Sequence, residues 1–262
     1  MVRVVHEVLP QERQQRILEI LRRDGRVVAN ELATSFGVSE DSIRRDLREM
    51  ASEGLCRRIY GGALLPTPNF PPLTQRVLKA DPVREGLAQY AAGLILPGQT
   101  ILLDAGSTNV EIAKALRGKS VTVVTNAPAV ATVLADEAIT ELVVIGGRVD
   151  PRSGGAIGSV AIQQLSTMQA DVSLLGACAV EPDYGAWGVN GEEAAFKQAM
   201  ARASDAVIIV ATDDKVGARG ACQLIEMAQI DHLVIRDTIP KDLADRFAKH
   251  ESRLHQVNLS KN

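Results

Sequence analysis

Apolar residues recur every three or four positions near the N-terminus, and this spacing predicts short helices. We expect helices over residues 11–23, over residues 30–36 and from residue 40 to the stop at residue 54, with an extended piece at residues 26–28. Arg13 is expected away from the apolar face of the first helix. Gly37 suits a left-handed cap of the second helix, and the Ser39 hydroxyl can cap the third. A helix, a glycine turn and another helix have helix-turn-helix spacing.

The third predicted helix is the candidate reader of DNA bases. Ile43, Leu47 and Met50 share one face of it and turn the polar residues elsewhere. Arg45 is the best candidate for a bidentate contact to guanine. The predicted DNA-binding residues of this segment are Ser39, Glu40, Ser42, Arg44, Arg45 and Arg48.

Residues 55–64 (LCRRIYGGAL) predict a small hairpin, or wing, with Gly61-Gly62 as its turn. Arg57, Arg58 and Tyr60 are expected to project from it along the DNA backbone. The alternative is a winged helix that binds protein, on which the arginines form only a solvated surface.

Strand-like apolar runs alternate with helical segments through the rest of the chain. The runs are TILLD, VTVVT, ELVVI, DVSLL, AVIIVA and HLVI. A helix that begins at Pro82 precedes them, and the β-then-α order predicts a doubly wound, mostly parallel α/β sheet. Four prolines lie between residues 66 and 72, before that helix, and they predict an irregular, semi-rigid linker. We therefore expect a DNA-binding domain over residues 1–65, a linker over residues 66–81 and an α/β sensing domain over residues 82–262.

Composition and charge refine this picture. The chain is 46% hydrophobic but only 3% aromatic, so aliphatic residues form the core. The net charge of −3 argues against a nucleic-acid partner only if the charge is evenly spread. Residues 1–65 contain 11 Arg, no Lys and 10 acidic residues, and arginines of the third helix and the wing make a local basic patch.

Several classes of protein are not expected. No apolar run reaches the ~18 residues of a membrane helix, so we expect a cytoplasmic protein without a membrane partner. The cysteines lie far apart, which predicts neither disulfides nor a metal site. The glycine-rich run at residues 154–158 lacks the spacing of a dinucleotide fingerprint, so no cofactor is expected.

Polar clusters follow the strand-like runs, at the place where parallel sheets bind ligands. In the segment DAGSTN, Gly106 permits close backbone approach, and the hydroxyls and helix amides that follow suit a phosphate. A tight turn capped by Ser or Thr would look the same. The predicted effector-binding residues are Asp104, Gly106, Ser107, Thr108, Asn109, Thr125, Asn126, Gly146, Gly147, Arg148 and Lys215. Lys215 could instead pair with neighbouring acids, and Lys197 could equally face solvent.

The segment RQQRILEILRRDGRVVANELATSFGVSEDSIRRDLREMASEGLCRRIYGGA resembles the N-terminal module of the DeoR family of bacterial regulators, and the similarity continues through nearly the whole chain. The resemblance implies a sensor domain similar in fold to ribose-5-phosphate isomerase that binds phosphorylated sugars or related metabolites. It implies DAGSTN as the phosphate loop, TN and GGR as pocket walls, and Lys215 as an anion contact. It also favours a repressor.

Two further expectations concern partners and activity. One short recognition helix covers too few base pairs for useful specificity, so we expect a homo-oligomer on paired half-sites. An enzyme is the competing interpretation, because Asp104, Glu192 and Lys215 could transfer protons. Nothing in the sequence places a base and an acid together, so we expect a regulator rather than an enzyme.

Overall fold

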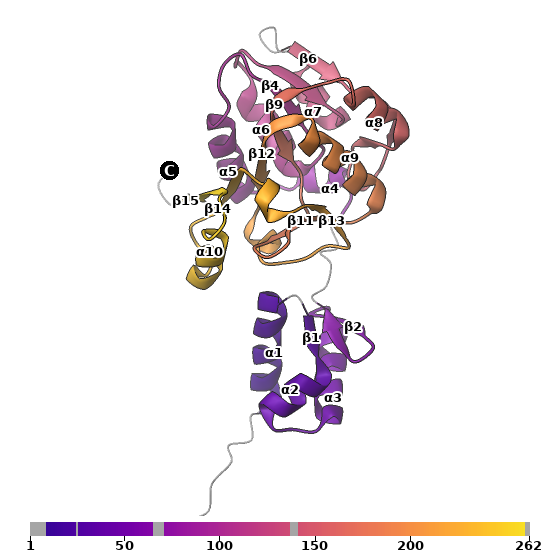
Figure 1. The fold of residues 1–262 in the computed structure, drawn as a ribbon, viewed down its shortest axis with the longest axis vertical. Helices are drawn as coiled ribbons and strands as arrows, with labels where there is room; N and C mark the ends of the chain where they lie inside the picture. The colour runs from indigo at the N-terminus through magenta and orange to yellow at the C-terminus, as the bar shows by residue number, and fades with distance from the viewer. Residues whose placement is uncertain (1–8, 25, 65–70, 137–140, 260–262) are drawn as a thin grey trace, which may run out of the picture. The chain divides into compact units, whose positions relative to one another are not determined.

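The computed structural model describes residues 9–24, 26–64, 71–136 and 141–259 (Figure 1). Its contacts divide the chain into two units, the first formed mainly by residues 1–67 and the second by residues 68–216 and 220–262. In the described ranges, no helix combines the length and the apolar character that a membrane span requires.

The first unit contains the predicted helices and the predicted wing. Its elements are α1 (Pro10–Asp24), β1 (Arg26–Val28), α2 (Ala29–Phe36), α3 (Glu40–Ser52), β2 (Arg57–Ile59) and β3 (Gly62–Leu64). Gly37 takes the left-handed conformation at the end of α2, with φ of 66°. Ser39 caps α3, since its hydroxyl accepts a hydrogen bond from the Ser42 amide at 3.2 Å. Buried residues of the helices, Ile17 and Leu21 of α1 with Ile43 and Leu47 of α3, form the core.

The turn of the wing differs by one residue from the prediction. Ile59 pairs with Gly62, so the turn is Tyr60-Gly61, and the predicted Gly61-Gly62 turn is wrong. Gly61 has a φ of 79° and supplies the turn's left-handed residue. Gly62 lies inside β3, where a Cβ atom would sit 2.0 Å from the carbonyl oxygen of Val27. The second glycine therefore allows β1 and β3 to approach.

The second unit is built on a seven-stranded parallel sheet within the described residues. In chain order its strands are β4 (Thr100–Leu103), β5 (Thr122–Thr125), β6 (Glu141–Val144), β9 (Ala170–Leu175), β12 (Ser204–Val210), β14 (His232–Arg236) and β15 (Arg253–Val257). The spatial order is β15-β14-β12-β9-β4-β5-β6, and every neighbouring pair is parallel. All six strand-like runs are confirmed, and β15 is an addition.

Helices cover both faces of this sheet (Figure 1). One face packs against α5 (Pro82–Gly93), α6 (Ser107–Leu116) and α7 (Pro128–Leu134), and the other against α8 (Ser159–Leu165), α9 (Gly191–Arg202) and α10 (Lys241–Phe247). Successive residues of β4 alternate between the two cores: Ile101 and Leu103 join the first, and Leu102 joins the second. The doubly wound α/β fold is confirmed.

Short elements add to this framework, and the sequence analysis predicted none of them. They are β7 (Arg148–Val149) with β8 (Ala156–Ile157), the antiparallel sheet of β10 (Ala179–Glu181), β11 (Gly185–Gly188) and β13 (Cys222–Ile225), and the 3-10 turns η1 (Asp213–Lys215) and η2 (Met227–Gln229).

A helix, α4 (Leu73–Leu78), lies in the stretch that was predicted to be irregular. The four prolines of that stretch all precede Leu73, and Pro72 stands at the N-cap position, where a missing amide hydrogen costs little. Leu73 is buried against Gly154, where a Cβ atom would meet its side chain at 2.2 Å. Residues 66–70 of the predicted linker lie outside the described residues.

Candidate functional sites

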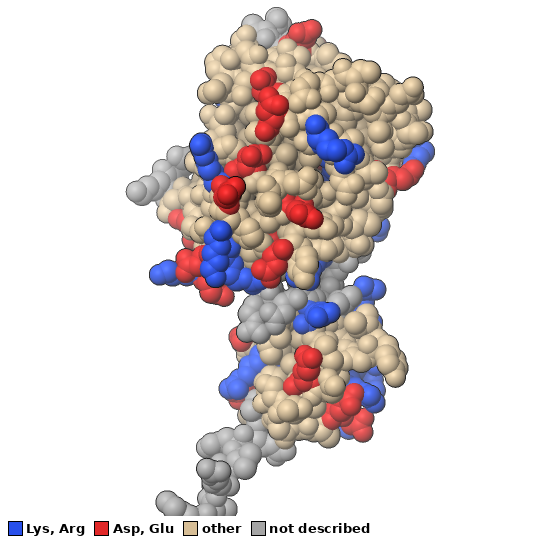
Figure 2. Space-filling model, viewed as in Figure 1, with Lys and Arg blue, Asp and Glu red and all other residues tan. Residues whose placement is uncertain are grey.

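The exposed side of α3 carries basic groups. Arg45 and Arg48 are exposed, and neither forms an ion pair with another residue in the described part of the chain. Arg44 is held by Glu40, with 2.7 Å between Nη2 and Oε1. Figure 2 shows basic side chains over the side of this unit that carries α3 and β2, with acidic ones beside them. A mixed surface of this kind agrees with a local patch rather than a wholly basic domain.

A buried ion pair fixes the inner side of α3. Arg13 of α1 donates from Nε to Asp46 Oδ2 at 2.5 Å and from Nη2 to Oδ1 at 3.2 Å. The two side chains are only 7% and 3% exposed. The expectation that Arg13 lies away from the core is therefore wrong, because its bidentate pairing with Asp46 lets the charge be buried.

The wing presents Arg57, Arg58 and Tyr60 to solvent, as predicted. Tyr60, at the turn, is fully exposed. At the N-terminus of α3, the Ser39 and Ser42 hydroxyls lie 2.9 Å apart and bond each other. The predicted DNA-binding residues thus come together as a capped helix end, an exposed helix face and a hairpin tip.

A second site lies where the strand order of the large sheet reverses. From β4 the chain continues to β5 and β6 on one side, whereas β9 and later strands lie on the other. Open α/β sheets bind ligands beyond the carboxyl ends of strands at such a point. Here Asp104 follows β4, Gly176 follows β9, and the Gly176 amide donates to Asp104 Oδ2 at 2.9 Å. A Cβ atom on Gly176 would lie 2.6 Å from the Ala105 carbonyl oxygen, so this close approach requires glycine.

Buried charged side chains meet beneath this junction. Lys197 of α9 lies 3.1 Å from Asp104 Oδ2 and 2.6 Å from Glu193 Oε1, and it also donates to the Gly176 carbonyl. Lys197 is 3% exposed, Asp104 1% and Glu193 7%. The expectation that Lys197 could face solvent is therefore wrong. Asp104 is occupied in holding the loop together, which favours an orienting role over direct contact with a sugar hydroxyl.

Two carboxylates share one ammonium in this cluster. Burial would lower the pKa of Lys197, but Asp104 and Glu193 outweigh it and hold that pKa above its ordinary value. Burial raises the pKa of Asp104, and Lys197 opposes the shift only in part because Glu193 adds a second negative charge. Lys197 is thus firmly protonated and already neutralised.

Two further cations adjoin the cluster. Burial lowers the pKa of Lys215 to about 8. The charge of Asp214 opposes this shift, and the charges of Arg76 and Lys197 add to it. Burial also lowers the pKa of Arg76, against the pull of Glu193. Arg76, from α4, donates to the carbonyls of Pro71 and Arg152. A buried lysine whose charge is disfavoured by burial and by neighbouring cations is a suitable partner for an anion.

The predicted effector residues divide by what their side chains do. Asn109 donates to the carbonyls of Asp104 and Leu174, and Thr125 donates to Leu103 and accepts from Ala127, so both tie strand ends together. In contrast, Thr108 Oγ1 and Asn126 Oδ1 are buried and have no hydrogen-bond partner among the described residues. These atoms remain available to a ligand.

The Gly146–Arg148 segment is not part of the buried cluster. Its glycines are exposed, and Gly146 exchanges hydrogen bonds with the Gln164 side chain. Arg148 is 60% exposed and pairs with Glu192. Its predicted place in a pocket wall stays a prediction.

The sequence analysis overlooked Glu193, Gly176 and Arg76 as site residues. The sequence did contain a signal for Glu193. Glu193 and Lys197 have i, i+4, i+7 spacing with the apolar Met200, so they share one face of the helix with a core residue. A charged pair in phase with an apolar stripe indicates a buried pair. The contacts of Gly176 and Arg76 depend on tertiary structure and left no such signal.

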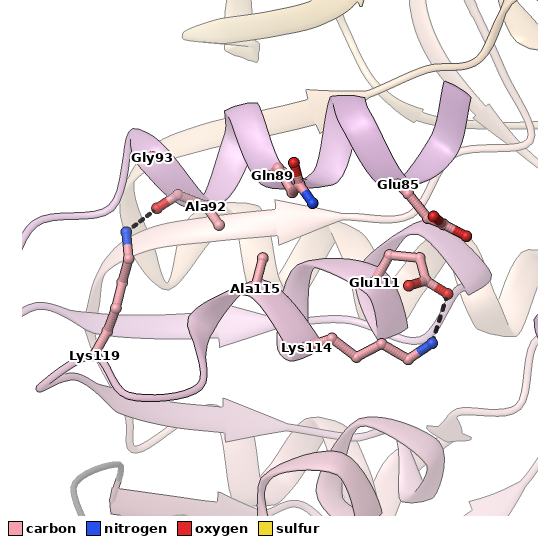
Figure 3. A pocket seen from close by; sticks show the side chains of 8 residues that line it. All are labelled: Glu85, Gln89, Ala92, Gly93, Glu111, Lys114, Ala115 and Lys119. Atoms are coloured by element: carbon pink, nitrogen blue, oxygen red, sulfur yellow. Dashed lines mark hydrogen bonds and ion pairs between the residues drawn. The ribbon is translucent and has the colours of Figure 1, made fainter. Parts of the chain in front are cut away.

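A separate groove of about 580 Å³ lies between α5 and α6 (Figure 3). Its lysines face partners inside the groove: Lys114 bonds Glu111 at 3.0 Å, and Lys119 donates to the Ala92 carbonyl. The groove therefore offers an anion fewer available positive charges than the junction of β4 and β9 does. Among the described residues, no group of three or more His, Cys, Asp or Glu side chains could hold a metal ion.

Models of two protein families match the chain. The "DeoR-like helix-turn-helix domain" matches residues 13–69, and the "DeoR C terminal sensor domain" matches residues 82–237.

Curated proteins match over nearly their full length. The putative aga operon transcriptional repressor of Escherichia coli O157:H7 is 30% identical over 91% of this chain and 90% of that protein. The HTH-type transcriptional repressor GlcR of Bacillus subtilis is 31% identical, with 90% and 93% covered. The glycerol-3-phosphate regulon repressor of Escherichia coli K12 is 28% identical, with 93% and 97% covered. Among solved structures, ribose 5-phosphate isomerase A from Methanocaldococcus jannaschii shares 16% identity over 51% of this chain and 53% of that chain, with a TM-score of 0.39.

Proposed function

The chain belongs to the DeoR family of DNA-binding transcriptional regulators, and from this we propose that it is a repressor whose affinity for its operator changes when a phosphorylated sugar or related metabolite binds. Relatives named as repressors, including one of a glycerol-3-phosphate regulon, support both parts of this proposal.

The observation that carries the DNA-binding part is the two-sided character of α3. Its inner side is held by the Arg13–Asp46 pair and by apolar residues, so its outer side is presented rigidly. That outer side exposes Arg45 and Arg48, which suit a guanine edge and a phosphate respectively. Arg57 and Arg58 of the wing are placed to add phosphate contacts.

The observation that carries the effector part is the buried contact of Lys197 with Asp104 of the DAGSTN loop, together with the charge of Lys197 acting on Lys215. We propose that Ser107, Thr108 and the first amides of α6 hold a phosphate there, with Lys215 as a cation beside it. Asp104 and Asn109 then shape the loop, and Asn126 faces the bound metabolite.

An electrophoretic shift on the DNA upstream of the chain's own gene, repeated with a panel of sugar phosphates, tests both parts. We expect a shifted complex, which at least one sugar phosphate weakens or strengthens by about 5- to 150-fold. Ser107→Ala and Lys215→Ala should reduce that response. If both variants keep wild-type effector affinity and response, the proposed pocket is wrong even though the protein is a regulator.

The same unit is proposed to bind its effector without converting it. Sugar isomerisation needs an acid and a base at adjacent carbons, whereas Asp104 and Lys197 are paired with each other. Relatedness of fold does not confer activity. Incubation of each effector with the protein, followed by phosphorus NMR, should return the effector unchanged.

A further inference from the structure

Three buried polar atoms around the β4–β9 junction have no hydrogen-bond partner within the described ranges: Thr108 Oγ1, Asn126 Oδ1 and Glu193 Oε2. Their residues are 6%, 1% and 7% exposed. Leaving such an atom unpaired is costly, so folded proteins contain few of them. Three around one ligand-binding position indicate groups that a ligand satisfies.

The three residues surround the same loop. Glu193 reaches it through Lys197, whose ammonium lies 3.1 Å from Asp104 Oδ2. Thr108 belongs to the loop itself. Asn126 adjoins it, because a Cβ atom on Gly155 would meet both Asn126 Nδ2, at 2.7 Å, and the Ala105 side chain, at 2.8 Å.

The chemistry of these atoms divides the site into two halves. The first turn of α6 offers donors, which a phosphate accepts from. Asn126 Oδ1 and Glu193 Oε2 are hydrogen-bond acceptors, so each requires a donor. A phosphate dianion supplies none. Lys197 and Lys215 lie nearby and disfavour a further ammonium group. A hydroxyl is the neutral donor that a phosphorylated sugar supplies.

We propose that Glu193 is a specificity-determining residue of the effector site, and that its Oε2 atom accepts a hydrogen bond from a hydroxyl of the phosphorylated ligand. This inference rests on the proposed function and names the ligand class more closely, as a phosphate ester that carries hydroxyl groups. Lys197 holds the other oxygen, Oε1, at 2.6 Å, and Asp104 holds Lys197. Both are positioning residues, because they fix the direction in which Oε2 points.

Calorimetric titration of the full chain tests the proposal with four probes: inorganic phosphate, propyl phosphate as a hydroxyl-free ester, ribose 5-phosphate and glucose 6-phosphate. Glu193→Gln is the test variant. Lys197 requires an acceptor, so the amide oxygen of the new side chain faces it and the NH2 group replaces Oε2. Glu141→Gln, an identical charge change at an exposed site on β6, is the control.

We expect the wild type and Glu141→Gln to bind at least one sugar phosphate more tightly than propyl phosphate. Glu193→Gln should reduce that preference by about 10- to 100-fold, because it removes a hydrogen bond to a charged group. Its affinity for inorganic phosphate should not change. A general structural lesion would weaken both, and that result contradicts the proposal.

Other outcomes separate the two levels of inference. If Glu193→Gln binds with an undiminished preference for sugar phosphates, this inference alone is overturned. A wild type that binds ribose and glucose phosphates no better than propyl phosphate overturns it without recourse to any variant. A wild type that binds no phosphate at all contradicts the proposed effector site as well.

Discussion

Arg45 is expected to read a base edge, and its loss should remove selectivity without unfolding the unit. Arg45→Ala should cost about 1–3 kcal/mol of discrimination between operator and random DNA, the contribution of a bidentate guanine contact. Fluorescence anisotropy titrations on both DNAs measure this difference.

Arg44→Ala is the matched control for that experiment. Arg44 is the adjacent arginine and is already paired with Glu40, so its removal should change the ratio of operator to random-DNA affinity much less. An Arg45→Ala variant with wild-type selectivity would show that this side chain does not read the operator.

Lys215 should make effector binding depend on pH. Burial lowers the pKa of Lys215 to about 8, and a bound phosphate favours the protonated ammonium, so binding raises that pKa and takes up a proton. Affinity should therefore be highest below about pH 8 and fall by up to about tenfold per pH unit above it, since the phosphate, with a second pKa of about 6, is already a dianion.

Calorimetry from pH 7 to pH 9 checks this dependence, with Lys215→Gln as the comparison. The variant should bind more weakly and with a nearly flat pH profile. Equal wild-type affinity at both ends of the range would place Lys215 outside the effector contact.

The residues that the sequence analysis misplaced are charged side chains with buried partners. Arg13 was expected away from the apolar face of its helix, and for Lys197 a position facing solvent was left open, because a lone cation is rarely buried. Each is buried because a carboxylate from another element meets it, Asp46 for Arg13 and Asp104 for Lys197. Partners that lie 33 and 93 positions away cannot be paired from one sequence, whereas the local DAGSTN pattern could be recognised.

The pairing between α1 and α3 should matter more to stability than any exposed ion pair of the same unit. Asp46→Ala removes the carboxylate that faces the buried Arg13 and should destabilise the unit by about 3–5 kcal/mol. Glu12→Ala breaks the exposed Arg16–Glu12 pair and should cost less than about 1 kcal/mol. Differential scanning calorimetry of both variants tests the contrast. Equal melting temperatures would mean that apolar packing alone holds α3.

The wing should act through charge rather than through base recognition. Arg57→Ala and Arg58→Ala should each weaken binding to operator and random DNA alike and reduce the slope of log affinity against log salt by about 1. Titrations at several salt concentrations measure the slope. A slope that neither substitution changes would remove β2 from the interface.

The large sheet could be predicted from its long apolar runs, whereas the short elements could not be predicted. Six of its strands stood out because strands buried on both faces are continuous in aliphatic residues. β15 (RLHQV) carries polar residues at the sheet edge and gave a weaker pattern. The strands β7 and β10, of two and three residues, are too short for periodicity to indicate. The helix α4 was missed because the sequence analysis treated the whole stretch as irregular. Its prolines all precede α4, and α4 itself contains none.

A single copy of the first unit presents one α3 helix, which covers few base pairs, so the working molecule is expected to contain at least two copies. Sedimentation velocity at micromolar concentration should detect a homo-oligomer, and the operator should contain paired half-sites about one helical turn apart, or a multiple of it. A monomer both with and without DNA would contradict this expectation.

The strand order also has a consequence for synthesis of the chain. β4 is made before its neighbour β9, and 66 residues separate Leu103 from Ala170. Until β9 emerges from the ribosome, β4, β5 and β6 can form only half of a sheet, and the side of β4 that β9 will cover remains an open, aliphatic edge. Open edges of this kind recruit strands from other chains, and long-range parallel pairing closes slowly. The β4–β9 junction, which we propose as the effector site, should thus also be a point at which the nascent chain is exposed to aggregation.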